Sequence, residues 1–103
     1  MVVLHVTVRV KPEQVGKFLD AALDNAEHSK QDEQGCLRFD MIQDRDDPYC
    51  FYFYEVYRDE VAFAAHRQSA HFKGYFEKAK DWLAGPAERR FGTNVTPSDA
   101  AWR

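Results

Sequence analysis

Cysteine is scarce in this sequence, and long apolar runs are missing. The two cysteines, Cys36 and Cys50, have neither metal-ligand spacing nor redox-motif spacing. No apolar run approaches the roughly 20 residues that a membrane-spanning helix needs. Residues 1–5 lack the basic start and the cleavage site of a signal peptide. We therefore expect a cytoplasmic protein with no membrane partner, in which both cysteines are reduced thiols that fill apolar space.

Positive charge and glycine are also scarce. Lys and Arg number 14 against 17 Asp and Glu, and the resulting formal net charge of -3 argues against a nucleic-acid partner. The five glycines form no nucleotide-binding loop, and there is no nucleophile elbow. None of the four histidines is paired with another at i, i+4 spacing. These absences predict a protein without bound metal, flavin or haem.

Aromatic residues are abundant by contrast, at 15% of 103 residues, which is enough for the core of one domain over 1–103. Residues 50–57, Cys-Phe-Tyr-Phe-Tyr-Glu-Val-Tyr, predict an interior strand covered on both faces. Glu55 is the only carboxylate in this strand, and a buried carboxylate needs a partner or a raised pKa. We therefore place Glu55 in a functional site. A salt bridge to Arg9 or Arg38 is the structural alternative.

The remaining elements follow from hydrophobic periodicity and from capping residues. Strict alternation predicts further strands over 2–10, 36–43 and 91–95. Apolar residues at helical spacing predict a helix from Pro12 to a stop at Gly35, where we expect a left-handed backbone. A second helical region begins at an Asp59 N-cap, breaks near residues 69–71 and ends at residues 85–86.

The order strand, helix, strand, strand, helix, strand is typical of an α+β, ferredoxin-like split βαβ sandwich. In this architecture the helices cover one face of the sheet and leave the other open. The open face predicted here is too apolar and aromatic for a monomer. We therefore expect a homodimer formed through the sheets, with the tail 96–103 and its Trp102 packed on the partner subunit.

Three polar residues near the predicted core are candidates for chemistry. His66 lies beside small alanines in a helix and is suited to proton transfer, whereas the structural alternative is a surface histidine. His71, at the helix break, is a candidate for lining the same cavity, although on one continuous helix it would face away from His66. Asn25 borders an apolar helical stripe and is suited to holding a substrate oxygen or to capping. We expect Glu55 and His66 to face one cavity and to transfer protons as a pair.

Four blocks of the sequence resemble one known family. They are EQGCLRFD (33–40), FYEVYRDE (53–60), AFAAH (62–66) and SAHF (69–72). They are similar to the antibiotic biosynthesis monooxygenase family, and the similarity extends over nearly the whole chain. The resemblance implies a dimeric α/β barrel of ferredoxin-like subunits. Members of that family include small quinol monooxygenases, which use O₂ without flavin, haem or metal, and an isomerase of a phosphorylated hydroxypentanedione.

The resemblance also implies a site lined by Phe39, Tyr54, Glu55 and His66. Our first interpretation is a cofactor-independent monooxygenase for a small quinol or phenol. The alternatives are the isomerase, whose phosphate would need a cation such as Arg9, Arg38 or Lys73, and a non-catalytic small-molecule binder. The full set of candidates is Glu55 and His66 as catalytic residues, with Asn25, Arg38, Phe39, Tyr54, His71 and Phe72 as substrate-binding residues.

Overall fold

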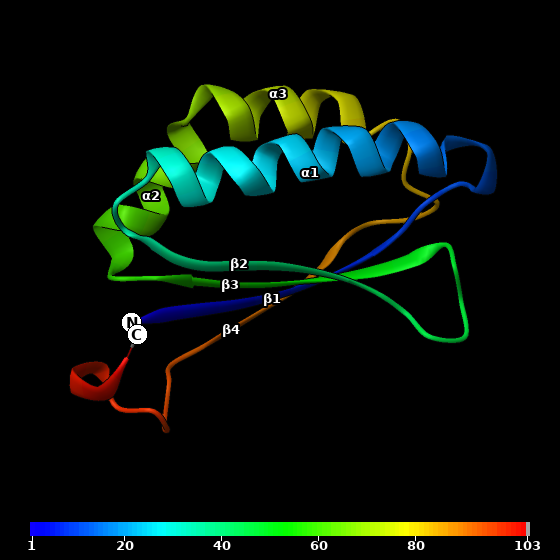
Figure 1. Ribbon diagram of the computed structural model, residues 1–103. Coiled ribbons are helices and arrows are strands. Elements are labelled where there is room, and N and C mark those ends of the chain that lie inside the picture. The colour runs from blue at the N-terminus through cyan, green and yellow to red at the C-terminus, as the bar shows by residue number, and fades with distance from the viewer. Residues whose placement is uncertain (103) are drawn as a thin grey trace.

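The computed structural model describes residues 1–102 and contains one four-stranded antiparallel sheet with helices on one face (Figure 1). The strand order is β2-β3-β1-β4, which is the ferredoxin-like arrangement expected from the sequence. The elements are β1 Val2–Arg9, η1 Pro12–Gln14, α1 Val15–Asp32, β2 Cys36–Gln43, β3 Cys50–Tyr57, α2 Glu60–Gln68, α3 Ala70–Ala79, β4 Glu88–Gly92 and η2 Asp99–Ala101.

The core lies between the sheet and the antiparallel pair α1 and α3. Alternation in β1 points every second side chain toward the helices, and these residues are at most 7% exposed. On α1, Phe18 and Ala22 face them from the expected apolar stripe. The stripe continues into two polar residues, Asn25 and Ser29, which are equally buried. Buried polar groups need partners. Asn25 lines the cavity described below, and the hydroxyl of Ser29 donates a hydrogen bond to the carbonyl of Asn25.

The aromatic strand β3 is an interior strand, as predicted, and pairs with β1 on one side and β2 on the other. Phe51, Phe53, Glu55 and Tyr57 point toward the helices and are at most 5% exposed. Tyr54 belongs to the opposite face of the sheet, because successive side chains of a strand alternate.

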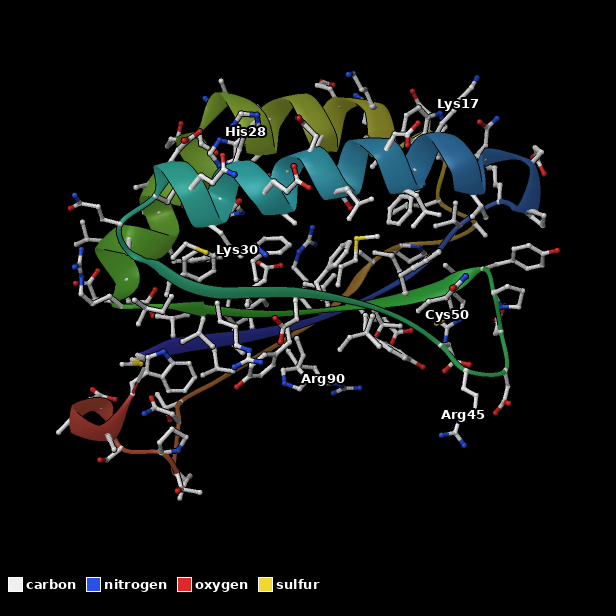
Figure 2. All side chains as sticks on the ribbon, viewed as in Figure 1. Lys17, His28, Lys30, Arg45, Cys50 and Arg90 are labelled. Carbon is white, nitrogen blue, oxygen red and sulfur yellow. The ribbon has the colours of Figure 1, made fainter. Side chains whose placement is uncertain are left out.

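The predicted last strand at 91–95 is wrong by several residues. The strand is β4, in which Glu88 pairs with Thr7 and Phe91 pairs with Leu4. The edge of β1 needs a hydrogen-bonding partner, and residues 88–92 provide it although their first three residues are charged. Figure 2 shows Arg90 of this strand on the face opposite the helices. Val95 lies beyond the strand and is 92% exposed.

The left-handed backbone predicted for Gly35 is also wrong. Gly35 has no positive φ, so it is not a left-handed helix stop. A Cβ built at this position would overlap the Cβ of Ala62 on α2. The residue is therefore needed for the close approach of α2 to the start of β2. In β2 itself a bulge shifts the register between Cys36 and Arg38, so that Leu37 has no partner on β3, whereas Phe39 pairs with Glu55.

The helix break near residue 69 is confirmed, as is the Asp59 N-cap, whose side chain accepts a hydrogen bond from the N–H of Ala62 at 2.8 Å. Ser69 has extended backbone dihedrals and serves both helices. Its N–H donates to the carbonyl of His66, and its Oγ accepts from the N–H of Phe72. Because one residue ends α2 and begins α3, the two helices can point in different directions.

The helices α1, α2 and α3 all lie on one face of the sheet, and none of them covers the second face (Figure 1). The tail returns to the N-terminus, where the Met1 amino group lies 3.7 Å from Asp99. Trp102 is half-buried, and its Nε1 is buried without a hydrogen-bond partner among residues 1–102. Packing of the tail on a partner subunit stays a prediction. Within the part of the chain that the structure describes, no helix is both long and apolar enough to cross a membrane.

Candidate active site

A cavity of about 890 Å³ lies between the sheet and the helices α2 and α3. Its walls are mostly apolar, and aromatic side chains from both layers contribute to them. Five of the predicted site residues line it, namely Asn25, Phe39, Glu55, His66 and Phe72. Glu55 and His66 therefore border one cavity, as the sequence predicted. The aromatic lining comes from Phe39, Phe53, Phe63, Phe72, Tyr75, Phe76 and Phe91.

His66 is held by a carboxylate that sequence reasoning did not single out. Its Nδ1 lies 2.9 Å from Oε2 of Glu33, the C-cap residue that follows α1, and a carboxylate oxygen can only accept a hydrogen bond from it. The His66 side chain is 3% exposed. Burial lowers the pKa of His66 below its ordinary value, and Glu33 opposes part of this shift. The ring is therefore neutral at pH 7, with its proton on Nδ1.

His71 donates to the same oxygen of Glu33, from Nε2 at 2.5 Å. On one continuous helix His66 and His71 would face apart, but the break at Ser69 turns α3 relative to α2 and brings both rings to Glu33. The second oxygen of Glu33, Oε1, is buried and has no hydrogen-bond partner within residues 1–102. His71 does not line the large cavity; Glu33 links it to His66, which does. In the sequence, the only indication that Glu33, His66 and His71 meet was the predicted helix break between the two histidines.

Glu55 has a different environment. Its Oε1 accepts a hydrogen bond from the hydroxyl of Tyr57 at 2.6 Å. Burial raises the pKa of Glu55 to about 7, while Tyr57 and the charge of Arg89 act in the opposite direction. Glu55 therefore exchanges a proton near neutral pH. The salt-bridge alternative does not hold, because Arg9 pairs with Glu88 and Arg38 pairs with Asp40.

Asn25 is 3% exposed, and its Oδ1 has no partner among the described residues. Since buried amide groups are nearly always hydrogen-bonded, this oxygen is available to a ligand. Phe39 and Phe72 pack near the His66 ring, with centroids 6.0 and 5.0 Å from it. These two rings fix the orientation of the imidazole.

Two predicted site residues lie elsewhere. Tyr54 and Arg38 are on the open face of the sheet, where the guanidinium of Arg38 lies 5.9 Å from the Tyr54 ring centroid. His5 packs edge-on against the same tyrosine. Tyr54 cannot share the cavity of its own subunit with Glu55, because adjacent residues of a strand point to opposite faces.

The cations of the cavity are also not those expected from the sequence. Arg67 on α2, Lys80 after α3 and Arg89 on β4 line it, whereas Arg9, Arg38 and Lys73 do not. Arg89 was missed because its strand was predicted three residues too late. The cavity thus combines two proton-exchanging groups, an unpartnered amide, aromatic walls and three cations.

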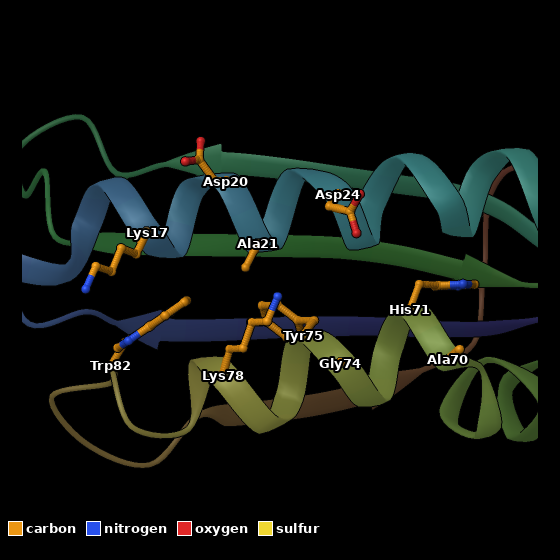
Figure 3. Close-up of a pocket in the computed structure, with 10 residues that line it drawn as sticks. All are labelled: Lys17, Asp20, Ala21, Asp24, Ala70, His71, Gly74, Tyr75, Lys78 and Trp82. Carbon is orange, nitrogen blue, oxygen red and sulfur yellow. The ribbon is translucent and has the colours of Figure 1, made fainter.

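A smaller groove of about 520 Å³ runs between α1 and α3 on the outer side of the helices (Figure 3). His71 lies at one end of this groove and Trp82 at the other. His71 therefore connects the groove to the Glu33 cluster.

Known proteins match this chain closely in sequence and in fold. The isomerase of (4S)-4-hydroxy-5-phosphonooxypentane-2,3-dione from Klebsiella pneumoniae is 34% identical over 97 residues, covering 94% of this chain and 98% of the relative. The Bacillus subtilis protein named "Putative monooxygenase YcnE" is 33% identical over 88 residues, covering 85% and 92%.

A solved structure described as "Putative antibiotic biosynthesis monooxygenase from Nitrosomonas europaea" superposes with a TM-score of 0.88. It is 34% identical and covers 92% of this chain and 99% of its own. The family pattern of the antibiotic biosynthesis monooxygenases matches residues 1–78. On this similarity of sequence, fold and length, the chain belongs to the antibiotic biosynthesis monooxygenase family.

Proposed function

We propose that the protein is an enzyme in which His66 removes a proton from a small quinol or phenol, and that the reaction is oxygenation by O₂. The observation that carries this proposal is the His66–Glu33 pair at the edge of an aromatic cavity. Glu33 occupies Nδ1, which leaves the lone pair of Nε2 for the substrate hydroxyl. Glu33 thereby sets the tautomer of the base and stabilises the imidazolium that forms.

The chemistry requires only proton transfer from the protein. A deprotonated quinol is electron-rich enough to reduce O₂ itself. One oxygen atom is inserted into the ring and the other leaves as water, so that a quinol and O₂ give a hydroxyquinone and water. The aromatic walls hold the flat ring and exclude bulk water. The amide of Asn25 orients a substrate oxygen.

Glu55 serves as the second proton-exchanging group in this proposal. Its carboxyl group is partly protonated near pH 7, because its raised pKa lies there. It can donate a proton to the reduced oxygen that leaves as water, while His66 accepts the proton of the substrate. Glu55 and His66 therefore act on one substrate without contacting each other.

Isomerisation of a phosphorylated hydroxydione is a second candidate. The cations Arg67, Lys80 and Arg89 favour it, since a phosphate monoester needs such groups. The relatives of 34–35% identity that carry this activity in their name support it as well. In that reaction His66 would remove a proton from one carbon and Glu55 would return one to its neighbour.

Oxygen consumption distinguishes the candidates. Purified protein is incubated with a panel of quinols in an oxygen electrode, and the phosphorylated hydroxydione is followed by NMR in parallel. Oxygen uptake that depends on His66 supports the monooxygenase. Conversion of the dione without oxygen uptake overturns it in favour of the isomerase. Saturable binding of either compound without turnover assigns the protein as a binder and overturns both.

A further inference from the structure

We propose that Glu33, His66 and His71 form a binding site for a divalent transition-metal ion of the Zn²⁺ type, and that the ion switches off the catalytic base. The sequence alone argued against such a site, since the two histidines lack ligand spacing. The helix break at Ser69 brings them together on one carboxylate.

The geometry and chemistry of the three groups fit a metal ion. One ligand atom from each residue lies within 4.8 Å of the others. Two imidazoles and a carboxylate are a frequent ligand set of zinc and iron, with an open position for water. Neighbouring ligands of a tetrahedral zinc ion stand roughly 3.3 Å apart. The nitrogens lie 2.9 and 2.5 Å from the Glu33 oxygen, so each must move by less than about 1 Å.

A second observation points to a ligand at this place. The Oε1 atom of Glu33 is buried and has no partner within residues 1–102, so hydrogen bonds to the histidines leave half of the carboxylate unsatisfied. A cation between the three side chains gives this oxygen an electrostatic partner. The outer groove also gives an ion a way in, because His71 lines it and Asp24 lies nearby on α1 (Figure 3).

The consequence for catalysis rests on the proposed function. A metal bound to Nδ1 of His66 displaces the hydrogen bond to Glu33 and leaves the imidazole proton on Nε2. The ring then has no lone pair facing the cavity and cannot accept a proton from the substrate. The ion would thus inhibit the enzyme from a position outside the substrate cavity.

Metal binding is tested without substrate. After treatment with a chelator, the protein is titrated with Zn²⁺ by calorimetry, and Co²⁺ serves as a spectroscopic probe of coordination. We expect one ion per chain. His71→Ala and Glu33→Gln should each weaken binding by more than about 100-fold, the upper end of the loss for a residue outside the ligand set. His5→Ala removes a histidine from the opposite face of the sheet and should leave the affinity unchanged. Equal affinity in wild type and His71→Ala overturns the site, provided that circular dichroism shows both to be folded.

Inhibition is tested separately with the substrate found for the wild type. Zn²⁺ should abolish turnover in the wild type at the concentration that fills the site, and a chelator should restore it. The remaining activity of His71→Ala should be insensitive to the same concentration. Stoichiometric binding with unchanged turnover overturns the switch but not the site. If instead the proposed function is wrong, no turnover will be seen at any metal concentration, while metal binding will be unaffected.

Discussion

Glu33 and His66 are separated by 33 positions in the chain, yet Oε2 of one lies 2.9 Å from Nδ1 of the other. The contact joins the end of α1 to the last turn of α2 beneath a common aromatic cavity. It orients a histidine that burial keeps neutral. Most of the proposed chemistry depends on this pair.

Replacing the base should reduce turnover without unfolding the protein. We expect His66→Ala to lower kcat by roughly 10²–10⁴-fold, the usual contribution of a general base. The exposed His28 on α1 provides a control, and His28→Ala should keep wild-type kinetics. Steady-state kinetics and circular dichroism measure the two effects. Wild-type rates in His66→Ala would remove the histidine from the mechanism.

Glu33 is a positioning residue, so its removal should affect both rate and pH dependence. Glu33→Gln should reduce kcat by between about 10-fold and 10⁴-fold, because the tautomer of His66 is no longer fixed. Glu33 raises the pKa of His66 against the effect of burial. The acid limb of the kcat/KM profile should therefore move to lower pH in the variant. A lower melting temperature with an unshifted profile would make Glu33 merely structural.

Glu55 should make stability depend on pH in a defined direction. Its pKa rises from 4.5 to about 7 on folding, so the folded state binds the proton more tightly. Stability from this group is complete below pH 4.5 and is lost as the pH rises toward 7. The loss is about 3 kcal/mol at most. Glu55→Gln should therefore stabilise the protein at pH 8 and change little at pH 4. Urea unfolding at the two pH values measures this, and destabilisation at pH 8 would contradict it.

The open face of the sheet should form a homodimer. We propose this because Ile42, which is 47% exposed, lies there with the partly exposed Tyr54, and none of the helices α1, α2 and α3 covers them. An obligate interface of this kind buries on the order of 2,000 Å² in total. Analytical ultracentrifugation at micromolar concentration should give a dimer mass. Tyr54→Asp should shift it toward the monomer, whereas Val61→Asp, on the exposed side of α2, should not. A monomeric wild type would reject the proposal.

Gly35 should be intolerant of any side chain. Gly35→Ala places a Cβ against Ala62 and should cost about 1–3 kcal/mol, the usual effect of overpacking. Gly74 is the matched control, since a Cβ there meets nothing within 4 Å and lies inside α3. Gly74→Ala should stabilise the protein by about 1 kcal/mol. Denaturant unfolding compares the variants, and equal effects at the two glycines would exclude the close contact as the cause.

The sequence by itself determined the strands β1 and β3 and which face of each is buried. Alternation placed β1 and β3 correctly, because a strand with a period of two reports directly which face meets the core. The same rule identified Glu55 as a carboxylate facing inward. Ser69 and Asp59 were recognised as helix ends, because capping depends on side chains within three residues.

The tertiary structure alone decided which buried polar groups meet. The contacts of Glu33 with His66 and His71, of Glu55 with Tyr57, and of Gly35 with Ala62 depend on how the helices pack on the sheet. β4 was misplaced because its position along the sequence is set by pairing with the open edge of β1 and not by its own apolar pattern. Periodicity describes one element at a time, whereas a site is formed by the angle and distance between elements, which only the packed core sets.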